Sequence, residues 1–516
     1  MTDLRRQITR LSDRPSFRVL AVAAGLIIFA ALMWSNLGHP DFWLDESITA
    51  GHIGQPEHIY WDAFHPPGYY WLLMHWRDIF GPGDMALRSF SVVWALLAVV
   101  LVWLLASGLL ESTADLLALW LFVLSPLGLL YLRTARYFAM TTALFLLVAY
   151  LLLLAATEGR WRHYILLGVA AAALLWANYV AALLLLPGYL LLFCVARRDQ
   201  PGYLVRWLVS AALPIMALCP LAVRLLDSLS AVSGIPQTAH LQGTLYGLGI
   251  KLGLPVYAAI VGENTDPWRF YITVPVFLAG GILLVAGFVG ARGDRRPGRW
   301  LKLWAWPAAI MAVALVFSTA ARSEPIVRVT SVALFALPFA YILMARGAQA
   351  LRAPLLAGVL VALLFVGDLY GIHNYFAGQQ FLNPANNVPW QQIVDTVRAL
   401  WQPGDLVVEC YDASFRRYWA DDTTMIEYRL PVPVADMEPV QQFPQSGQRI
   451  WLVARDRGAH LPRQMTTEIR DELAQKASEV QIFNFKPLSP AVRRWRSRLL
   501  RQPVWDAYIK LYLFVP

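Results

Sequence analysis

The chain has 516 residues, of which 58% are hydrophobic and only 15% are charged, and its mean hydropathy is +0.49. A soluble protein would carry about 25% charged residues, so the composition excludes an ordinary soluble enzyme. The net charge is +9, but the arginines gather between apolar runs, a pattern that indicates anionic membrane lipid and argues against nucleic acid. We therefore predict a polytopic α-helical membrane domain over 1–372 and an extramembrane α/β domain over 373–516.

Long apolar runs predict about 11 transmembrane helices. The first run, after Arg18, has about twenty residues and is long enough to span, whereas the core of a signal peptide has about 7–15. The predicted spans are 17–37, 86–107, 115–132, 138–157, 161–177, 179–196, 203–223, 269–291, 302–320, 326–345 and 353–372. The cut near Asn178-Tyr179 can also be placed differently. An odd number of spans that starts inside leaves the C-terminal domain outside.

The basic residues support this orientation, because they concentrate in the proposed inner segments such as 1–18 and 292–302. The segment around Glu111 and Asp115 is the exception, since it holds no basic residue. We predict a multi-pass protein of a bacterial cytoplasmic (inner) membrane, with its C-terminal domain on the periplasmic or extracellular side.

The first outer loop, 38–85, opens with the adjacent acids Asp45 and Glu46. Carboxylates at a membrane surface are costly unless they are used, so this pair is the first candidate for chemistry. The alternative is that the pair caps an interfacial helix. Pro66-Pro67 predicts the start of a second helix that lies along the membrane.

The second long outer loop, 224–268, is amphipathic through 245–261 and ends in Glu263-Asn264-Thr265-Asp266. A half-buried helix over the active site, a lid and a plain surface loop all fit this pattern. In the C-terminal domain, periodicity predicts helices over 390–401 and 461–474. It predicts strands over 406–410, 450–454 and 480–485.

The order of several short motifs resembles the GT-C glycosyltransferases, in particular protein O-mannosyltransferases and lipid A aminoarabinose transferases. The resemblance covers roughly residues 40–350. It rests on Leu44-Asp45-Glu46, His65-Pro66-Pro67-Gly68-Tyr69-Tyr70, Arg88-Ser89-Phe90-Ser91, Ser125-Pro126, Ala135-Arg136-Tyr137 and Arg328. It implies a GT-C-like fold and transfer of a sugar from a polyprenyl-phosphate donor, on the non-cytoplasmic face, to a lipid, glycan or protein acceptor.

The resemblance also implies roles for the acids. An attacking hydroxyl must lose a proton, which a nearby carboxylate can accept, and Asp45 matches the family's base. Glu46, its neighbour, is expected to orient a partner or to bind a divalent metal ion. Phe64-His65 stands where the aminoarabinose transferases carry Glu-Lys, so metal dependence is left open. The expected reaction is an inverting hexosyl or pentosyl transfer in cell-envelope glycosylation.

Arginine and histidine side chains at predicted outer helix ends are candidate ligands for the donor phosphate, because the guanidinium fork suits phosphate oxygens. These candidates are His65, Arg133, Arg136, Arg269 and Arg328. Tyr137 is a candidate substrate-binding residue that supports Arg136, and the alternative is a place in the aromatic belt. For each arginine, the alternative is snorkelling toward lipid headgroups. For His65 the alternative is packing.

Two other functional classes compete with the enzyme. A transporter or flippase of envelope precursors would also have many spans, but it usually shows internal repeats and ionisable groups near the midplane. Here the ionisable groups gather at one face. A non-catalytic assembly subunit is the third class, and loss of activity on changing Asp45 would argue against it.

Overall fold

The computed structural model of the chain forms two compact units. The first, here called the helical unit, consists of Met1–Leu37, His52–Ile235 and Gly247–Gln379. The second, here called the α/β unit, consists of Gly38–Gly51, Pro236–Tyr246 and Gln380–Pro516. The structure describes the chain except for 1–14, 56–64, 111–112, 180–188, 191–200, 223–244, 293–329, 381–386, 411–412, 422, 429–432, 456–460 and 502.

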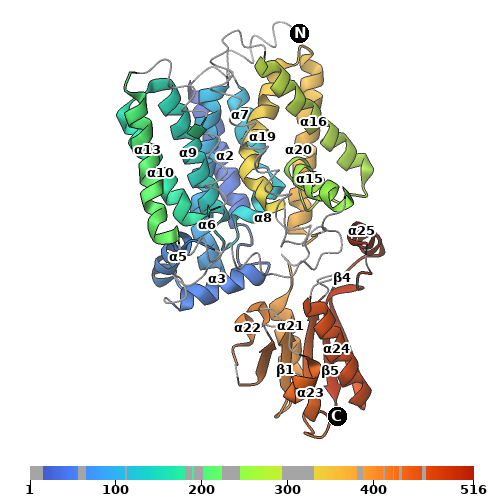
Figure 1. The fold of residues 1–516 in the computed structure, drawn as a ribbon. Coiled ribbons are helices and arrows are strands. Elements are labelled where there is room, and N and C mark those ends of the chain that lie inside the picture. Colours follow the sequence, from blue (N-terminus) through green and yellow to red (C-terminus); the bar gives the residue numbers. More distant parts are fainter. Residues whose placement is uncertain are drawn as a thin grey trace. The chain divides into compact units, whose positions relative to one another are not determined.

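The helical unit is built from apolar helices that lie side by side (Figure 1). Neighbours along the chain pack as pairs, such as α9 with α10 and α10 with α13. The described helices are α2 (Pro15–Trp34), α5 (Pro67–Phe80), α6 (Asp84–Leu109), α7 (Ala114–Val123), α8 (Pro126–Leu132), α9 (Phe138–Glu158), α10 (Trp161–Ala177), α13 (Tyr203–Leu218), α15 (Leu245–Ile260), α16 (Phe270–Arg292), α19 (Thr330–Ala350) and α20 (Pro354–Phe376).

Six of the described helices are long and apolar enough to cross a membrane, or seven if the pair α7 and α8 counts as one span. Two shorter apolar helices are Trp161–Ala177 and Leu334–Ala350. The protein is therefore a multi-pass membrane protein, whereas the predicted number of eleven is not confirmed. Of the predicted spans, 302–320 and most of 179–196 lie outside the described residues.

The predicted single span 115–132 is wrong in one respect, because α7 and α8 meet at a bend of 54°. Pro126 cannot continue the ladder of helical hydrogen bonds. Ser125 therefore starts a new helix, and its hydroxyl accepts a hydrogen bond from the Gly128 amide at 3.0 Å. The acid at the start of α7, Asp115, forms an ion pair with Arg18 of α2, so a basic partner comes from the first described helix.

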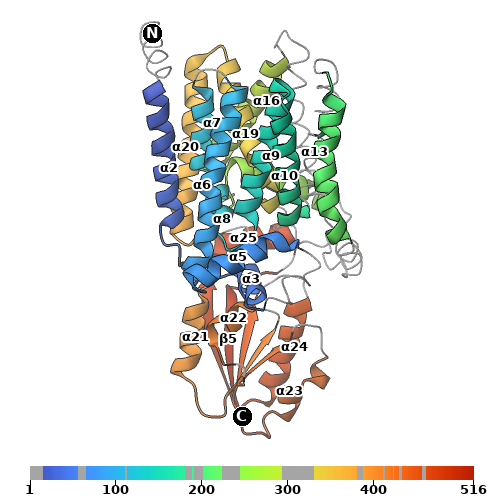
Figure 2. The same cartoon turned by 90° about the vertical axis from the view of Figure 1, so that its left-hand side faces the viewer.

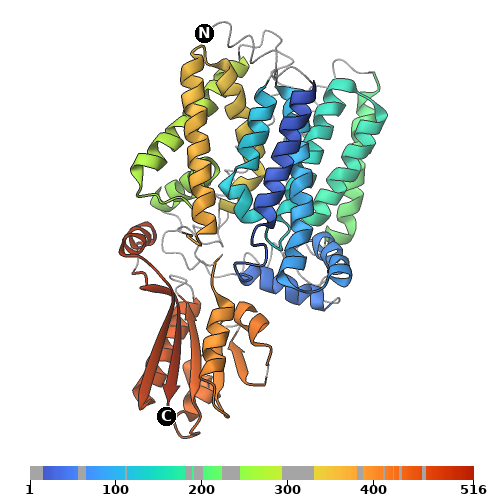
Figure 3. The ribbon, with the colours of Figure 1, turned by 180° about the vertical axis from the view of Figure 1, so that it is seen from behind.

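The α/β unit holds a five-stranded sheet in the order β2-β1-β3-β5-β4. β1 pairs in parallel with β2 and β3, while β5 pairs antiparallel with β3 and β4. The strands lie side by side in Figure 3. They are β1 (Leu406–Cys410), β2 (Met425–Tyr428), β3 (Ile450–Arg455), β4 (Glu479–Pro487) and β5 (Ala507–Val515).

Helices cover both faces of this sheet (Figure 2). Alternate strand residues point to opposite faces, so Val407 and Trp451 pack with α21 (Trp390–Ala399) and α22 (Ala413–Trp419). Val408 and Leu452 pack with α23 (Glu438–Gln442) and α24 (Leu461–Lys476). The unit also contains α25 (Pro490–Leu500), and α3 (Leu44–Gly54) begins within it.

Candidate active site

The acid pair Asp45-Glu46 lies in the first turn of α3. The two side chains have different surroundings, as expected for adjacent helical residues. Glu46 is fully buried, and its Oε2 accepts a hydrogen bond from the Trp43 amide at 3.4 Å. This contact satisfies a backbone donor at the helix start. Glu46 therefore caps α3, a role that the sequence left as an alternative for the acid pair. Asp45 is half-buried, and its backbone carbonyl accepts from the Thr49 hydroxyl at 2.8 Å.

The segment that precedes α3 is fixed within the α/β unit. The Asp41 carboxylate accepts a hydrogen bond from the Gln391 amide at 2.7 Å, in the first turn of α21. The Phe42 amide donates to the Tyr418 hydroxyl at 2.7 Å, and the Arg417 guanidinium lies 4.5 Å from the centre of the Phe42 ring. These contacts connect the residues just before Asp45 to α21 and α22, which lie more than 300 residues later in the sequence.

Three of the predicted substrate-binding residues come together in the helical unit. The Arg136 guanidinium lies 3.2 Å from His65 Nε2, and it donates to the Tyr70 hydroxyl at 3.3 Å. It also lies 5.1 Å from the centre of the Tyr137 ring, and the His65 and Tyr137 rings are 5.1 Å apart. Because a guanidinium can only donate, this contact is a hydrogen bond when His65 Nε2 carries no proton.

The turn between α8 and α9 supplies two members of this cluster. Arg136 comes just before Tyr137, which is the N-cap residue of α9. The amide groups that open a helix carry partial positive charge, so the helix start and the guanidinium both favour an anion here. Arg136 is nevertheless 5% exposed, and a buried charge is expensive unless it is paired or used.

The motif Pro66-Pro67-Gly68 places the aromatic part of the cluster. Pro67 occupies the first position of α5, where its missing amide proton costs nothing. A side-chain carbon on Gly68 would lie 2.6 Å from the backbone oxygen of Trp176 in α10. Glycine therefore allows α5 to approach α10 closely, and Tyr69 and Tyr70 follow directly. The predicted helix after Pro66-Pro67 is confirmed.

Arg133 contacts other parts of the helical unit. The side chain is 2% exposed, and Nη2 donates to the Ser35 carbonyl at 2.7 Å. Its guanidinium carbon lies 5.3 Å from the centre of the Tyr375 ring and 5.9 Å from that of Phe376. Arg133 thus connects α8 with the end of α2 and with α20.

Arg269 is held by an acid of its own segment. Its Nε lies 2.6 Å from Asp266 Oδ2, and the same oxygen accepts from the Tyr370 hydroxyl at 2.9 Å. The guanidinium carbon lies 5.6 Å from the centre of the Tyr370 ring. Its positive charge is therefore largely balanced inside the protein. The remaining predicted ligand, Arg328, lies outside the described residues.

Glu263, which was not among the site residues predicted from the sequence, is a further candidate. Glu263 is fully buried, and its Oε1 accepts a hydrogen bond from the Tyr131 hydroxyl at 2.8 Å. It opens a buried turn after α15 in which the Asn264 carbonyl accepts from Asn374 Nδ2 at 2.8 Å. Two acids, Glu263 and Asp266, next to a predicted span were the available signal. The buried turn at 263–266 rules out a plain surface loop at this end of 224–268.

Within the described residues, no three His, Cys, Asp or Glu side chains lie close enough together to hold a metal ion. Asp45 and Glu46 belong to the α/β unit, whereas His65, Arg136, Tyr137 and Glu263 belong to the helical unit.

Comparison with known proteins gives one family match. Residues 64–223 match the family model described as dolichyl-phosphate-mannose-protein mannosyltransferase. This stretch contains the whole cluster around Arg136. No curated protein sequence matches the chain.

Several solved structures have a similar fold. ArnT from Cupriavidus metallidurans in the apo state has a TM-score of 0.57 at 13% identity, covering 96% of this chain and 97% of that one. The same protein bound to undecaprenyl phosphate gives 0.54 at 13%, with 96% and 98% covered. The archaeal oligosaccharyltransferase AglB from Archaeoglobus fulgidus, in complex with an inhibitory peptide and a dolichol-phosphate, gives 0.54 at 11%, with 96% and 88% covered. These matches show a shared fold over nearly the whole chain.

Proposed function

We propose that this chain, a GT-C-type membrane protein by its fold and by the family match over residues 64–223, is a glycosyltransferase that uses a polyprenyl-phosphate sugar. The observation that carries the proposal is the cluster of His65, Arg136 and Tyr137. It combines a guanidinium, an imidazole and a helix start inside the family-matched stretch. ArnT and AglB, which share the fold, have been crystallised or otherwise solved with polyprenyl phosphates bound.

In the proposed reaction, the acceptor hydroxyl oxygen attacks the anomeric carbon and the bond from that carbon to the phosphate oxygen breaks. The hydroxyl proton passes to the Asp45 carboxylate, and the electron pair of the broken bond leaves with the polyprenyl phosphate. A single displacement inverts the configuration at the anomeric carbon. Arg136 stabilises the phosphate as its charge increases, through charge-assisted hydrogen bonds.

Glu46 has a positioning role in this scheme. Its hydrogen bond to the Trp43 amide fixes the first turn of α3, from which Asp45 projects. The contacts of Asp41 and Phe42 with α21 and α22 fix the preceding segment. We infer that residues 373–516 help to hold the base, while residues 1–372 carry the donor site.

We further propose that the enzyme works in a bacterial inner membrane, with the C-terminal domain on the periplasmic or extracellular side. The sugar is a hexose or pentose, and the acceptor is a lipid, glycan or protein. A transporter or flippase is disfavoured, because the fold is shared with transferases over 96% of the chain. The predicted donor ligands also gather at helix ends, whereas transporters keep ionisable groups near the midplane.

The proposal is tested with purified full-length protein and a lipid extract from a strain that lacks it. Release of free polyprenyl phosphate is followed by mass spectrometry. Asp45→Asn keeps the shape of the side chain but cannot accept a proton, so release should fall by about 10²–10⁴-fold. Glu46→Gln keeps an acceptor oxygen for the Trp43 amide, so it should lower the release of polyprenyl phosphate much less. Near-wild-type release by Asp45→Asn would exclude Asp45 as the base.

A further inference from the structure

Helix α25 of the α/β unit carries a basic face. Arg493, Arg494 and Arg498 are exposed, and Arg494 and Arg498, which are four residues apart, lie on one side of the helix. Val492 and Arg496 are each 7% exposed and form the buried side. The buried side of α25 is thus distinct from its exposed surface, which carries three guanidinium groups.

Both ends of α25 are fixed. The Ser489 hydroxyl caps the first turn by accepting from the Val492 amide at 3.3 Å. At the other end, the Tyr246 hydroxyl donates to the Leu499 carbonyl at 3.1 Å, and the Arg501 guanidinium carbon lies 4.0 Å from the centre of the Tyr246 ring. A segment distant in sequence therefore holds the helix end, so the basic face has a defined direction within the unit.

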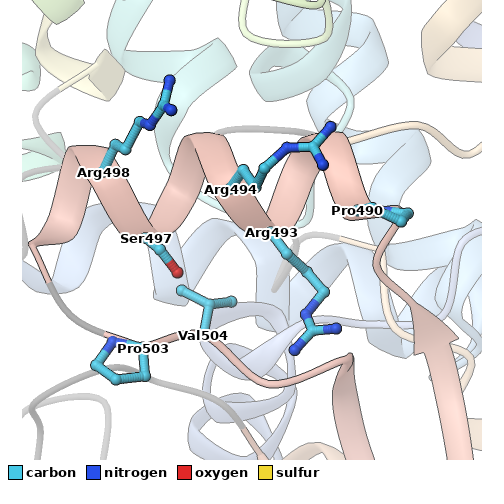
Figure 4. A pocket seen from close by; sticks show the side chains of 7 residues that line it. All are labelled: Pro490, Arg493, Arg494, Ser497, Arg498, Pro503 and Val504. Carbon is cyan, nitrogen blue, oxygen red and sulfur yellow. The ribbon is translucent and has the colours of Figure 1, made fainter.

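The basic face borders a pocket of about 460 Å³. Figure 4 shows Arg494 and Arg498 extending to one side of α25, and Arg493 extending to the other side, where Ser497 and Val504 lie. The lining consists of Pro490, Arg493, Arg494, Ser497, Arg498, Pro503 and Val504. It offers three guanidinium groups, one hydroxyl and an apolar wall, and it contains no acidic residue.

Helix stability explains Arg498, which lies in the last turn, but it does not explain Arg493 and Arg494. The first turn of α25 contains no acid, and a basic residue near the start of a helix opposes the helix dipole. In the described part of the chain, neither Arg494 nor Arg498 forms an ion pair. The Arg493 guanidinium is attracted to the Asp506 carboxylate, but that carboxylate already forms an ion pair with Lys510 at 2.7 Å.

We propose that this pocket binds a phosphate group carried by a larger molecule, either a membrane phospholipid or a phosphorylated saccharide. Guanidinium groups match the oxygens of a phosphate in charge and geometry, and the Ser497 hydroxyl adds a neutral donor. The volume leaves room for the rest of the molecule against Pro503 and Val504. This site uses none of the residues assigned to sugar transfer and is independent of that reaction.

The test uses native mass spectrometry of the full-length protein in neutral detergent, with two probes: phosphatidic acid and glucose 1-phosphate. The variant is Arg493→Gln/Arg494→Gln/Arg498→Gln. The matched control, Arg160→Gln/Arg162→Gln/Arg352→Gln, removes the same charge from exposed arginines of the helical unit. Wild type and control should bind at least one probe, and the variant should bind it about tenfold more weakly for each guanidinium lost.

Retention of phosphatidic acid identifies a lipid source, and retention of glucose 1-phosphate identifies a soluble saccharide. Either result supports the site when the variant alone is weakened. If neither probe binds wild type, or if variant and control bind equally, the proposal is wrong. Arg494→Lys keeps the positive charge. At equal thermal stability it should bind the probe more tightly than Arg494→Gln, which separates loss of the charge from misfolding.

Discussion

At the scale of single residues, the sequence predicted which residues belong to the candidate site better than it predicted their contacts. His65, Arg136 and Tyr137 were selected one by one from motifs, and the structure brings them together. Arg269 was selected in the same way, yet it is bound by Asp266. That pairing was readable, because the two residues are three apart in a turn, in which the Arg269 amide donates to the Asp266 carbonyl at 3.1 Å. The contact of Glu263 with Tyr131 was not readable, since 132 residues separate the two.

Arg136 gives the sharpest prediction at this scale. Charge-assisted hydrogen bonds contribute roughly 1.5–3 kcal/mol each, so Arg136→Ala should lower the efficiency of transfer by about one to two powers of ten. Arg136→Lys should rescue only partly, because it keeps the charge and loses the fork. Steady-state kinetics on a lipid-linked donor would measure both variants.

The control for Arg136 is Arg160→Ala, whose side chain is 61% exposed at the start of α10. It should leave efficiency within error of wild type. Full activity of Arg136→Lys would favour a simple headgroup contact and contradict the assignment of Arg136 as a phosphate ligand.

At the scale of elements, apolar helices with clear polar ends were predictable. The predicted span 161–177 coincides with α10, because seventeen mostly apolar residues lie between polar ends. The break between α7 and α8 was missed, although Ser125-Pro126 is a recognisable helix start. In the α/β unit, β5 and α25 were not predicted. β5 is an inner strand of the sheet and is buried on both faces. It therefore lacks the alternation of apolar and polar residues that marks a strand with one solvent-exposed face.

Gly68 tests how elements place the cluster. Gly68→Ala introduces a carbon at 2.6 Å from a backbone oxygen of α10, and backbone cannot give way as a side chain can. We expect α5 to shift, with a loss of about 1–3 kcal/mol in stability from overpacking. Transfer should fall as well, because Tyr70 contacts Arg136.

The matched substitution is Gly83→Ala, at a position before α6 where an added carbon meets nothing within 4 Å. Thermal melting and transfer rate should both stay at wild-type values. Equal effects of the two substitutions would show that close approach of α5 to α10 is not what Gly68 provides.

At the scale of the whole molecule, composition predicted a membrane part and a soluble part, and the structure has a helical unit and an α/β unit. The assignment of 38–51 to the α/β unit could not be predicted. Asp41 and Gln391 are 350 residues apart, and their contact depends on the fold of both segments. The eleven spans and the boundary at 372 stay predictions.

Topology can be measured with reporters that are active on one side of the membrane only. A fusion after residue 380 should report the non-cytoplasmic side, and a tag at residue 295 should report the cytoplasmic side. The arginines around residue 295 favour this arrangement. Both reporters on one side would overturn the eleven-span topology.

The central claim, transfer of a sugar from a polyprenyl phosphate, is tested most directly in cells. Lipid-linked sugars and envelope glycans are measured by mass spectrometry in a deletion strain complemented with wild type or with Asp45→Asn. The account predicts that the deletion and Asp45→Asn strains both accumulate one polyprenyl-phosphate sugar and both lose one envelope modification, which wild type restores. Unchanged lipid-linked sugars and envelope glycans in the deletion strain, or full restoration by Asp45→Asn, would contradict it.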